Sequence, residues 1–283
     1  MRVVLATLLA ALAASCSNGS DAPKFAAGEK IDLVGVRIDG PVLVAPRGDT
    51  VAFVDSETGN VFVPPKAGPP PRIAQFRLAD GARMRDVVFS TATNTLVGSY
   101  ATDDGPIVVA ERGPRTERST SRVVAEFESR AGGTLAFDDK GVLIALDGRI
   151  VRRDGTVVSE RWSGPVALAV DTTNRLWAVD AGGEGERARI ARGRERNQAK
   201  RHRFATFLPA GARPVAAAAD EDNVYVCDAA TSSVLRFYIG LDDVARRRGA
   251  VPGMRCEDDI AVSRDGSIVT SVDGQLWRYE SAD

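Results

Sequence analysis

The sequence contains a single histidine, His202, and this scarcity narrows the possible chemistry more than any motif does. A Ser-His-Asp triad, a histidine proton relay or a zinc site with two histidines must use that residue or is excluded. The chain also lacks a Walker loop, a GxSxG elbow, an HExxH helix and an EF-hand loop. The formal net charge is -1, so there is no overall basic character that would favour nucleic acid.

Long hydrophobic runs are missing after the first fifteen residues, so the remainder contains no candidate transmembrane helix. Met1-Arg2 provides a positive start, and Val3 to Ala14 is an apolar run too short to span a membrane. Small residues then precede Cys16. This layout is typical of a secretory signal peptide, and it resembles the bacterial lipobox, although Ala13 stands where a Leu is usual. We predict a signal peptide over 1–15, lipidation of Cys16 and a tether over 16–29; ordinary signal cleavage nearby is the alternative.

Cysteine is also scarce, since only Cys227 and Cys256 remain after Cys16. The absence of a CxxC pattern gives no zinc signal. In an oxidising, exported compartment a single pair is naturally interpreted as one disulfide. Two buried free thiols are the alternative.

What the sequence does contain is an internal repeat of two apolar strands joined by a turn of Asp, Asn, Lys or Gly. The turns suit β-hairpins, because Lys140-Gly141 and Asp265-Gly266 supply a positive φ. Valine, isoleucine, leucine and aromatic residues fill the flanks. The six copies are PVLVAPRGDTVAFVD from Pro41, DVVFSTATNTLVGSY from Asp86, GTLAFDDKGVLIALD from Gly133, PVALAVDTTNRLWAVD from Pro165, PVAAAADEDNVYVCD from Pro214 and DIAVSRDGSIVTSVD from Asp259.

A third apolar segment follows each hairpin, and the spacing of the units suits the blades of a propeller. We therefore predict an all-β domain over 30–283, folded as a six-bladed β-propeller of four-stranded blades. Closure of the ring protects sheet edges from aggregation. We expect Lys30 to Ile38 to provide the closing strand, and the only helix we expect is a short one from Leu241 to Arg248.

Several stretches resemble the glucose/sorbosone dehydrogenase family, whose members are exported six-bladed propellers. Met84 to Tyr100 with Thr102 to Gly105 is similar to the family's stretch that ends in Tyr-Thr and an acidic turn. Arg130 to Asp138 is similar to the blade that opens His-x-Gly-Gly, and Gly148 to Arg152 is similar to Gly-Lys-Ile-Leu-Arg. The acidic loop Gly182 to Glu186 corresponds to a Gly/Asp/Glu-rich loop. The resemblance extends from about Pro41 to about Tyr279 and implies pyrroloquinoline quinone (PQQ) and calcium as cofactors.

The most informative departure from this family is Arg130, which stands where His-x-Gly-Gly has its catalytic base. An arginine side chain stays protonated in proteins and cannot accept the substrate's proton. No stretch matches the family's cofactor-contacting residues, and His202 lies in a basic segment outside the motif. The resemblance thus implies a degenerate member without the usual catalytic histidine.

Polar residues recur where first strands begin and second strands end, which is the usual binding face of a propeller. Asp residues end strands well and bond their own turns, so a structural role is the alternative for each of them. Carboxylates also suit a polar ligand or a calcium ion. The candidate cleft residues are Arg85, Asp86, Arg130, Asp147, Asp180, Arg213, Asp228, Asp258 and Asp259.

A strongly basic segment covers residues 187–203. Contact with an anionic surface is one interpretation, and a solvated loop is the one we favour. For an exported chain we expect as partner a polar small molecule or a cell-envelope component, with membrane contact through the lipid anchor only and no nucleic acid. The expected location is the extracytoplasmic face of the cell membrane.

Three functions remain open at this point, because fold alone does not choose among them. The first is a lipid-anchored ligand-binding or interaction module without dehydrogenase chemistry. The second is a quinone-dependent sugar or alcohol dehydrogenase in which Asp86 replaces the histidine base. The third is a lactonase-like metal hydrolase, for which the sequence offers no recognisable metal cage.

Overall fold

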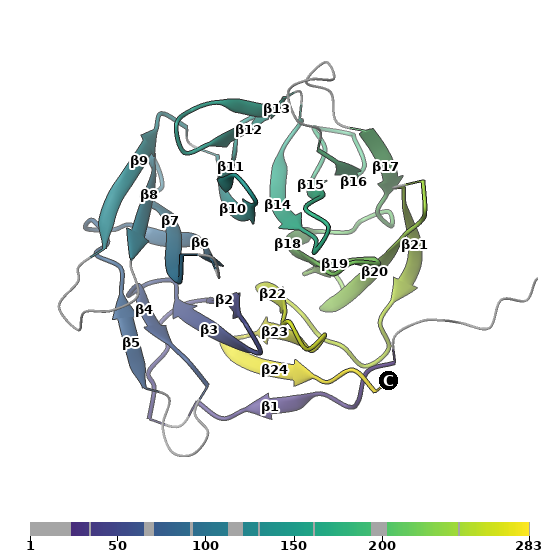
Figure 1. The fold of residues 1–283 in the computed structure, drawn as a ribbon, viewed down its shortest axis with the longest axis horizontal. Helices are drawn as coiled ribbons and strands as arrows, with labels where there is room; N and C mark the ends of the chain where they lie inside the picture. The colour runs from purple at the N-terminus through teal and green to yellow at the C-terminus, as the bar shows by residue number, and fades with distance from the viewer. Residues whose placement is uncertain are drawn as a thin grey trace, which may run out of the picture.

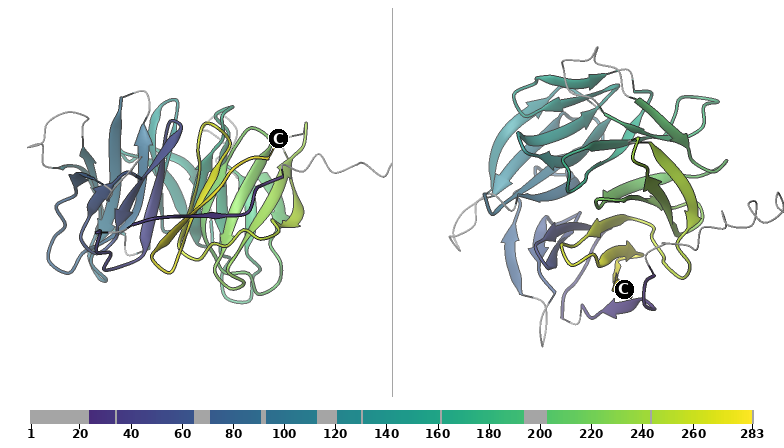
Figure 2. Two further views of the ribbon diagram at one scale, coloured as in Figure 1. Left: turned by 90° about the horizontal axis from the view of Figure 1, so that it is seen from below. Right: turned by 45° about the vertical axis from the view of Figure 1, so that its right-hand side comes forward.

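The computed structural model is a ring of six four-stranded antiparallel sheets around a central channel (Figure 1). It describes residues 24–33, 35–64, 71–90, 93–112, 121–129, 131–160, 162–193, 203–242 and 244–282. Seen from the side, the sheets stand next to one another in a disc (Figure 2). The predicted all-β, six-bladed propeller is therefore confirmed.

Each blade runs outward from an inner strand, in chain order. Blade 1 comprises β2 (Val42–Arg47), β3 (Thr50–Asp55), β4 (Asn60–Phe62) and β5 (Arg72–Gln75). Blade 2 comprises β6 (Arg83–Ser90), β7 (Thr95–Ala101), β8 (Ile107–Arg112) and β9 (Arg122–Phe127). Blade 3 comprises β10 (Gly132–Asp138), β11 (Gly141–Leu146), β12 (Arg149–Arg152) and β13 (Val157–Glu160).

The second half of the ring follows the same plan. Blade 4 comprises β14 (Pro165–Val170), β15 (Leu176–Asp180), β16 (Arg189–Arg192) and β17 (Arg203–Phe207). Blade 5 comprises β18 (Pro214–Ala219), β19 (Asn223–Asp228), β20 (Ser233–Ile239) and β21 (Ala245–Ala250). Blade 6 comprises β22 (Asp259–Val262), β23 (Ile268–Val272), β24 (Gln275–Tyr279) and, from the start of the chain, β1 (Glu29–Ile31).

The ring closes where β1 pairs antiparallel with β24, with Lys30 opposite Trp277 (Figure 1). This strand overlaps the expected closing segment, Lys30 to Ile38, only at Lys30 and Ile31, and it begins one residue earlier, at Glu29. The prediction of a short helix from Leu241 to Arg248 is wrong. Residues 245–250 form β21 instead, because their backbone pairs with β20, for example Arg246 with Tyr238, and completes the sheet of blade 5. Among the described residues no helix could cross a membrane.

The hydrophobic core is divided among the junctions between neighbouring blades. The inner strands of each sheet pack against neighbouring blades on both faces, which explains their continuous apolar runs, whereas outer strands such as β9 and β21 are largely exposed. Trp177, Tyr225 and Phe53 are among the largest fully buried side chains. Burial of one such side chain contributes about 1.5–3 kcal/mol, so the six junctions together stabilise the ring.

The strands of each blade alternate in direction, so each strand begins at one face of the disc and ends at the other, and the two faces carry different loops. At one face the inner strands begin and the second strands end; we call it the mouth face. At the other face the third strands end, and so does the C-terminal segment after β24; we call it the tether face. The N-terminal segment lies there too, since Ala26 N donates to Glu280 O at 2.9 Å and Ala282 N donates to Lys24 O at 2.7 Å.

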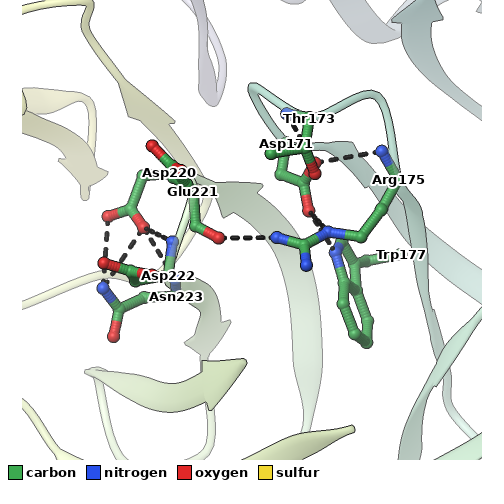
Figure 3. A network of polar contacts seen from close by, with 8 residues as sticks. All are labelled: Asp171, Thr173, Arg175, Trp177, Asp220, Glu221, Asp222 and Asn223. Atoms are coloured by element: carbon green, nitrogen blue, oxygen red, sulfur yellow. Dashed lines mark hydrogen bonds and ion pairs between the residues drawn. The ribbon is translucent and has the colours of Figure 1, made fainter. Parts of the chain in front are cut away.

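A polar network joins blades 4 and 5 on the tether face (Figure 3). The buried carboxylate of Asp171 accepts hydrogen bonds from Arg175 Nε at 2.6 Å and Trp177 Nε1 at 3.0 Å. The same guanidinium donates from Nη2 to Glu221 O at 2.6 Å, in the next blade. One aspartate therefore orients the arginine that links two adjacent hairpin turns.

We expect Asp171→Ala to lower the free energy of unfolding by roughly 1–3 kcal/mol, because Trp177 Nε1 is left buried without an acceptor. Urea unfolding followed by tryptophan fluorescence would measure this. Asp222→Asn, at an exposed position in the neighbouring turn, is the matched control and should change little. Equal stability of the two variants would contradict a structural role for Asp171.

Candidate functional site at the mouth of the central channel

The inner strands β2, β6, β10, β14, β18 and β22 line a central channel of about 270 Å³. Its wall is mostly apolar and small, with Val44, Leu135, Leu168 and Ala216 among the lining residues. The polar side chains in the lining belong to Arg85, Asp86, Thr134, Asp258 and Asp259, all near the starts of inner strands. The channel therefore has one polar, largely acidic end, which we call the acidic mouth, on the mouth face.

Irregular pairing at the starts of the inner strands shapes this end. The register shifts between Met84 and Asp86, and equivalent shifts occur at the starts of β10, β14 and β18. A bulge redirects side chains and ends regular pairing, which is why bulges are frequent beside binding sites. Gly132 and Gly133 both have φ +99, and a Cβ on Gly132 would collide with Ala145 O. The glycine pair is thus required by the backbone of blade 3.

The side chain of Asp86 joins blade 2 to blade 3. Its Oδ2 accepts a hydrogen bond from Leu135 N at 2.6 Å, and its Oδ1 accepts one from Val87 N at 2.6 Å. Ser99, the cross-strand partner of Asp86, donates from Oγ to Gly133 O. Backbone groups on the channel side of the inner strands have no strand partner, so Asp86 satisfies N–H groups there and Ser99 satisfies a carbonyl group.

Blade 6 repeats the same arrangement toward blade 1. Asp259 Oδ2 accepts from Val44 N at 2.6 Å, and Ser271, its cross-strand partner, donates from Oγ to Val42 O at 2.7 Å. We call each Asp–Ser pair with its two backbone partners a clasp. The two clasps connect four of the six blades across their inner strands and fix both carboxylates at the channel.

Burial disfavours the charged form of both carboxyl groups. It raises the pKa of Asp86 to about 7, although the two backbone N–H groups oppose the shift. Burial also raises the pKa of Asp259 well above its usual value, and the charge of Asp86 adds to this effect. A carboxyl pair that resists double ionisation can hold a proton near neutral pH.

Asp258 is the third carboxyl group of the acidic mouth. Its Oδ2 is buried and has no hydrogen-bond partner among the described residues. Burial raises its pKa, and the charges of Glu257 and Asp273 contribute in the same direction. Because Asp258 also lines the channel, its carboxyl group adds to the acidic character of the mouth.

The other predicted cleft residues lie away from the channel lining. Asp180 and Asp228 are buried and accept hydrogen bonds from loops of their own blades: Gly164 N, just before β14, donates to Asp180 at 2.7 Å, and Thr231 Oγ1 donates to Asp228 at 2.8 Å. Asp147 and Arg213 are exposed on the mouth face. Arg130, His202 and Cys16 lie outside the described residues.

The predicted disulfide is present and buried beside the mouth. Cys227, in the second strand of blade 5, is bonded to Cys256, which precedes the inner strand of blade 6. Their Cα atoms are 5.4 Å apart. This bond fixes the segment that carries Asp258 and Asp259.

The sequence interpretation found Asp86 and Asp259 but missed the serines that complete the clasps. The signal was present: Asp86 and Asp259 occupy the same position of the repeat, as DVVFS and DIAVS. Ser99 and Ser271 likewise occur at equivalent places in the following strands. If the first and second strands of each repeat had been aligned as antiparallel neighbours, each aspartate would have been paired with its serine.

Comparison with known proteins supports the fold and goes no further. No protein-family model and no curated protein matches the chain. The structure is similar to a PQQ-bound aldose sugar dehydrogenase from Streptomyces coelicolor (TM-score 0.68, 14% identity, 92% of this chain and 99% of that chain). It is similar to a putative oxidoreductase (glucose dehydrogenase) from Thermus thermophilus (TM-score 0.68, 16% identity, 90% and 99%). A putative gluconolactonase also matches (TM-score 0.60, 11% identity, 93% of each chain).

The acidic mouth does not suit the cofactors that this likeness suggests. PQQ is itself a polycarboxylate, and a site for it needs cationic or neutral hydrogen-bond donors. Three carboxyl groups dominate the mouth, and Arg85 is the one cation among its lining residues within the described part of the chain. No group of three or more His, Cys, Asp or Glu side chains in that part is placed to hold a metal ion. We therefore derive no reaction step through a quinone or calcium.

Proposed function

We propose that this chain is a lipid-anchored, extracytoplasmic binding module that takes an uncharged or cationic polar ligand at the acidic mouth. The single observation that carries the proposal is that the carboxyl groups of Asp86, Asp258 and Asp259 converge on the polar end of the channel. A ligand that donates hydrogen bonds from hydroxyl or ammonium groups suits these carboxyl groups, whereas an anionic ligand is repelled. The apolar channel wall offers contact area to the body of such a ligand.

A direct test is calorimetric titration of the native lipoprotein in detergent with three probes: glucose, spermidine and gluconate. We expect heat of binding with glucose or spermidine and none with gluconate. Asp258→Asn, which changes one acceptor oxygen to a donor, should weaken binding by about ten- to hundredfold, as loss of one hydrogen bond to a charged group does. Asp222→Asn on the tether face is the control. Tighter binding of gluconate than of the other two probes would refute the proposal.

One observation favours dehydrogenase chemistry as the alternative function. The pKa of Asp86 is raised to about 7, which is the range suited to a general base at neutral pH. Both of its oxygens, however, accept backbone N–H groups in the clasp. Reduction of a dye by the native protein with glucose, PQQ and calcium, abolished by Asp86→Asn and retained by Asp222→Asn, would establish this alternative in place of the binding module.

A further inference from the structure

The place where the N-terminal segment joins the domain has a consequence for orientation at a membrane. Phe25 pairs with Ser281, and its ring makes an edge-to-face contact with Tyr225 at 6.3 Å between centroids. The ring also packs on the core between blades 5 and 6. The chain is therefore fixed to the tether face from Phe25 onward, beside blades 5 and 6.

Even fully extended, the tether is only moderately longer than the disc is thick. Cys16 lies eight residues before Lys24, so the chain between them spans at most about 29 Å when fully extended. An inner strand of six residues, such as β2, is itself about 20 Å long, which approximates the distance from one face to the other. A bilayer that holds Cys16 is consequently reached most directly from the tether face.

The same face carries an exposed apolar side chain next to this attachment. Leu241, in the turn between β20 and β21, has a relative exposure of 106%. It follows the third strand of blade 5, as the C-terminal segment follows the third strand of blade 6, so both lie on the tether face. A fully exposed leucine at the tip of a turn is suited to the interface of a bilayer, where its side chain leaves water.

The charges around Leu241 are compatible with lipid headgroups. Asp242 and Arg246 form a two-bonded ion pair with both distances 2.8 Å. The acidic turn of Glu221 and Asp222 lies alongside, where Asp222 O accepts from Ile239 N at 2.6 Å. Arg247 and Arg248 are exposed on β21. The local balance of opposite charges avoids strong repulsion by an anionic or a zwitterionic surface.

We infer that the tether face of blade 5 rests on the lipid bilayer with Leu241 in its interface, so that the acidic mouth points away from the membrane. This inference rests on the proposed lipid anchor. It goes beyond anchoring because it assigns a protein surface to the membrane and places the ligand entrance on the opposite side. A ligand would then reach the channel from the space outside the membrane and not from the lipid.

The test uses the full lipoprotein, produced in a bacterium that processes it and reconstituted in phosphatidylcholine/phosphatidylglycerol vesicles. Leu241→Cys and Asp104→Cys place one reactive thiol on the tether face and on the mouth face, respectively. Asp104 is exposed in the turn between β7 and β8, and the native disulfide is buried, so labelling is selective. An environment-sensitive maleimide should show blue-shifted emission at 241 and not at 104. A bulky hydrophilic maleimide should react severalfold more slowly at 241.

The outcomes separate the orientation from the anchor. If the protein floats with the vesicles and both thiols react at equal rates without a spectral difference, the orientation is wrong and the anchor stands. If the protein does not float with the vesicles, the anchor is wrong and the orientation fails with it. Protection at 104 with free reaction at 241 would reverse the assignment of the two faces.

Discussion

Between pH 4 and pH 7 the free energy of unfolding of this protein is expected to fall as pH rises, and Asp86→Asn is expected to make that fall distinctly smaller. The pKa of Asp86 is raised from 3.8 to about 7 in the folded protein because the carboxyl group is buried. Above pH 4 the unfolded chain has lost this proton while the folded protein still holds it. Stability contributed by the protonated group is thus complete below pH 4 and is lost as pH rises through about 7.

The size of this effect has an upper bound of roughly 4 kcal/mol over the interval, since each pH unit contributes about 1.4 kcal/mol per proton. Asp259 acts in the same direction, and removal of the Asp86 charge also lowers the pKa of Asp259. The aspartates whose pKa is lowered, such as Asp138 and Asp180, act in the opposite direction, but only up to about pH 5, so their effect is confined to the lower end of this interval.

Urea unfolding at pH 4.5, 6.0 and 7.5 would measure the slopes. The variant also loses one acceptor in the clasp, so its absolute stability is lower at every pH; the informative quantity is the slope. Asp222→Asn should retain the slope of the unsubstituted protein. Parallel curves for the unsubstituted protein and Asp86→Asn would show that the carboxyl groups of the mouth do not retain a proton.

The Cys227→Ala/Cys256→Ala protein is expected to unfold with a free energy about 2–5 kcal/mol lower than that of the oxidised protein. The two cysteines are separated by 29 positions, and a crosslink over a loop of this size removes about 3–4 kcal/mol of chain entropy from the unfolded state. Both side chains are fully buried, so their shortening adds a packing loss. The midpoint of thermal unfolding should fall by roughly 5–15 °C.

Unfolding of the reduced, unsubstituted protein distinguishes the stability lost with the crosslink from the stability lost with the packing of the two side chains. Unfolding in urea with a strong reductant should reproduce most of the loss, because the thiols remain in place and only the bond is absent. The variant should also bind its ligand less tightly, since the segment before β22 carries Asp258 and Asp259. No change on reduction would mean that the bond contributes little to the native ring.

The hairpins, the blade order and the disulfide could be predicted from the sequence because each depends on local or repeated information. Alternation of apolar residues and turn residues such as Lys140-Gly141 fix a hairpin within about fifteen positions. The segment Leu241 to Arg248 was misjudged because its residues tolerate a helix, and only the unpaired edge of β20 makes it a strand. Tertiary pairing overrides local propensity at such a position.

The sequence by itself determined six repeated units, an acidic residue at the start of two inner strands and one cysteine pair. Only the tertiary structure decided which carboxylates meet, because closure of the ring brings Asp86 and Asp259 to one channel and leaves Asp180 and Asp228 bonded to loops of their own blades. It also decided that the N-terminal segment and the acidic mouth lie on opposite faces. That separation follows from strand direction: the third strand of every blade ends on the face opposite to the one at which the first strand begins.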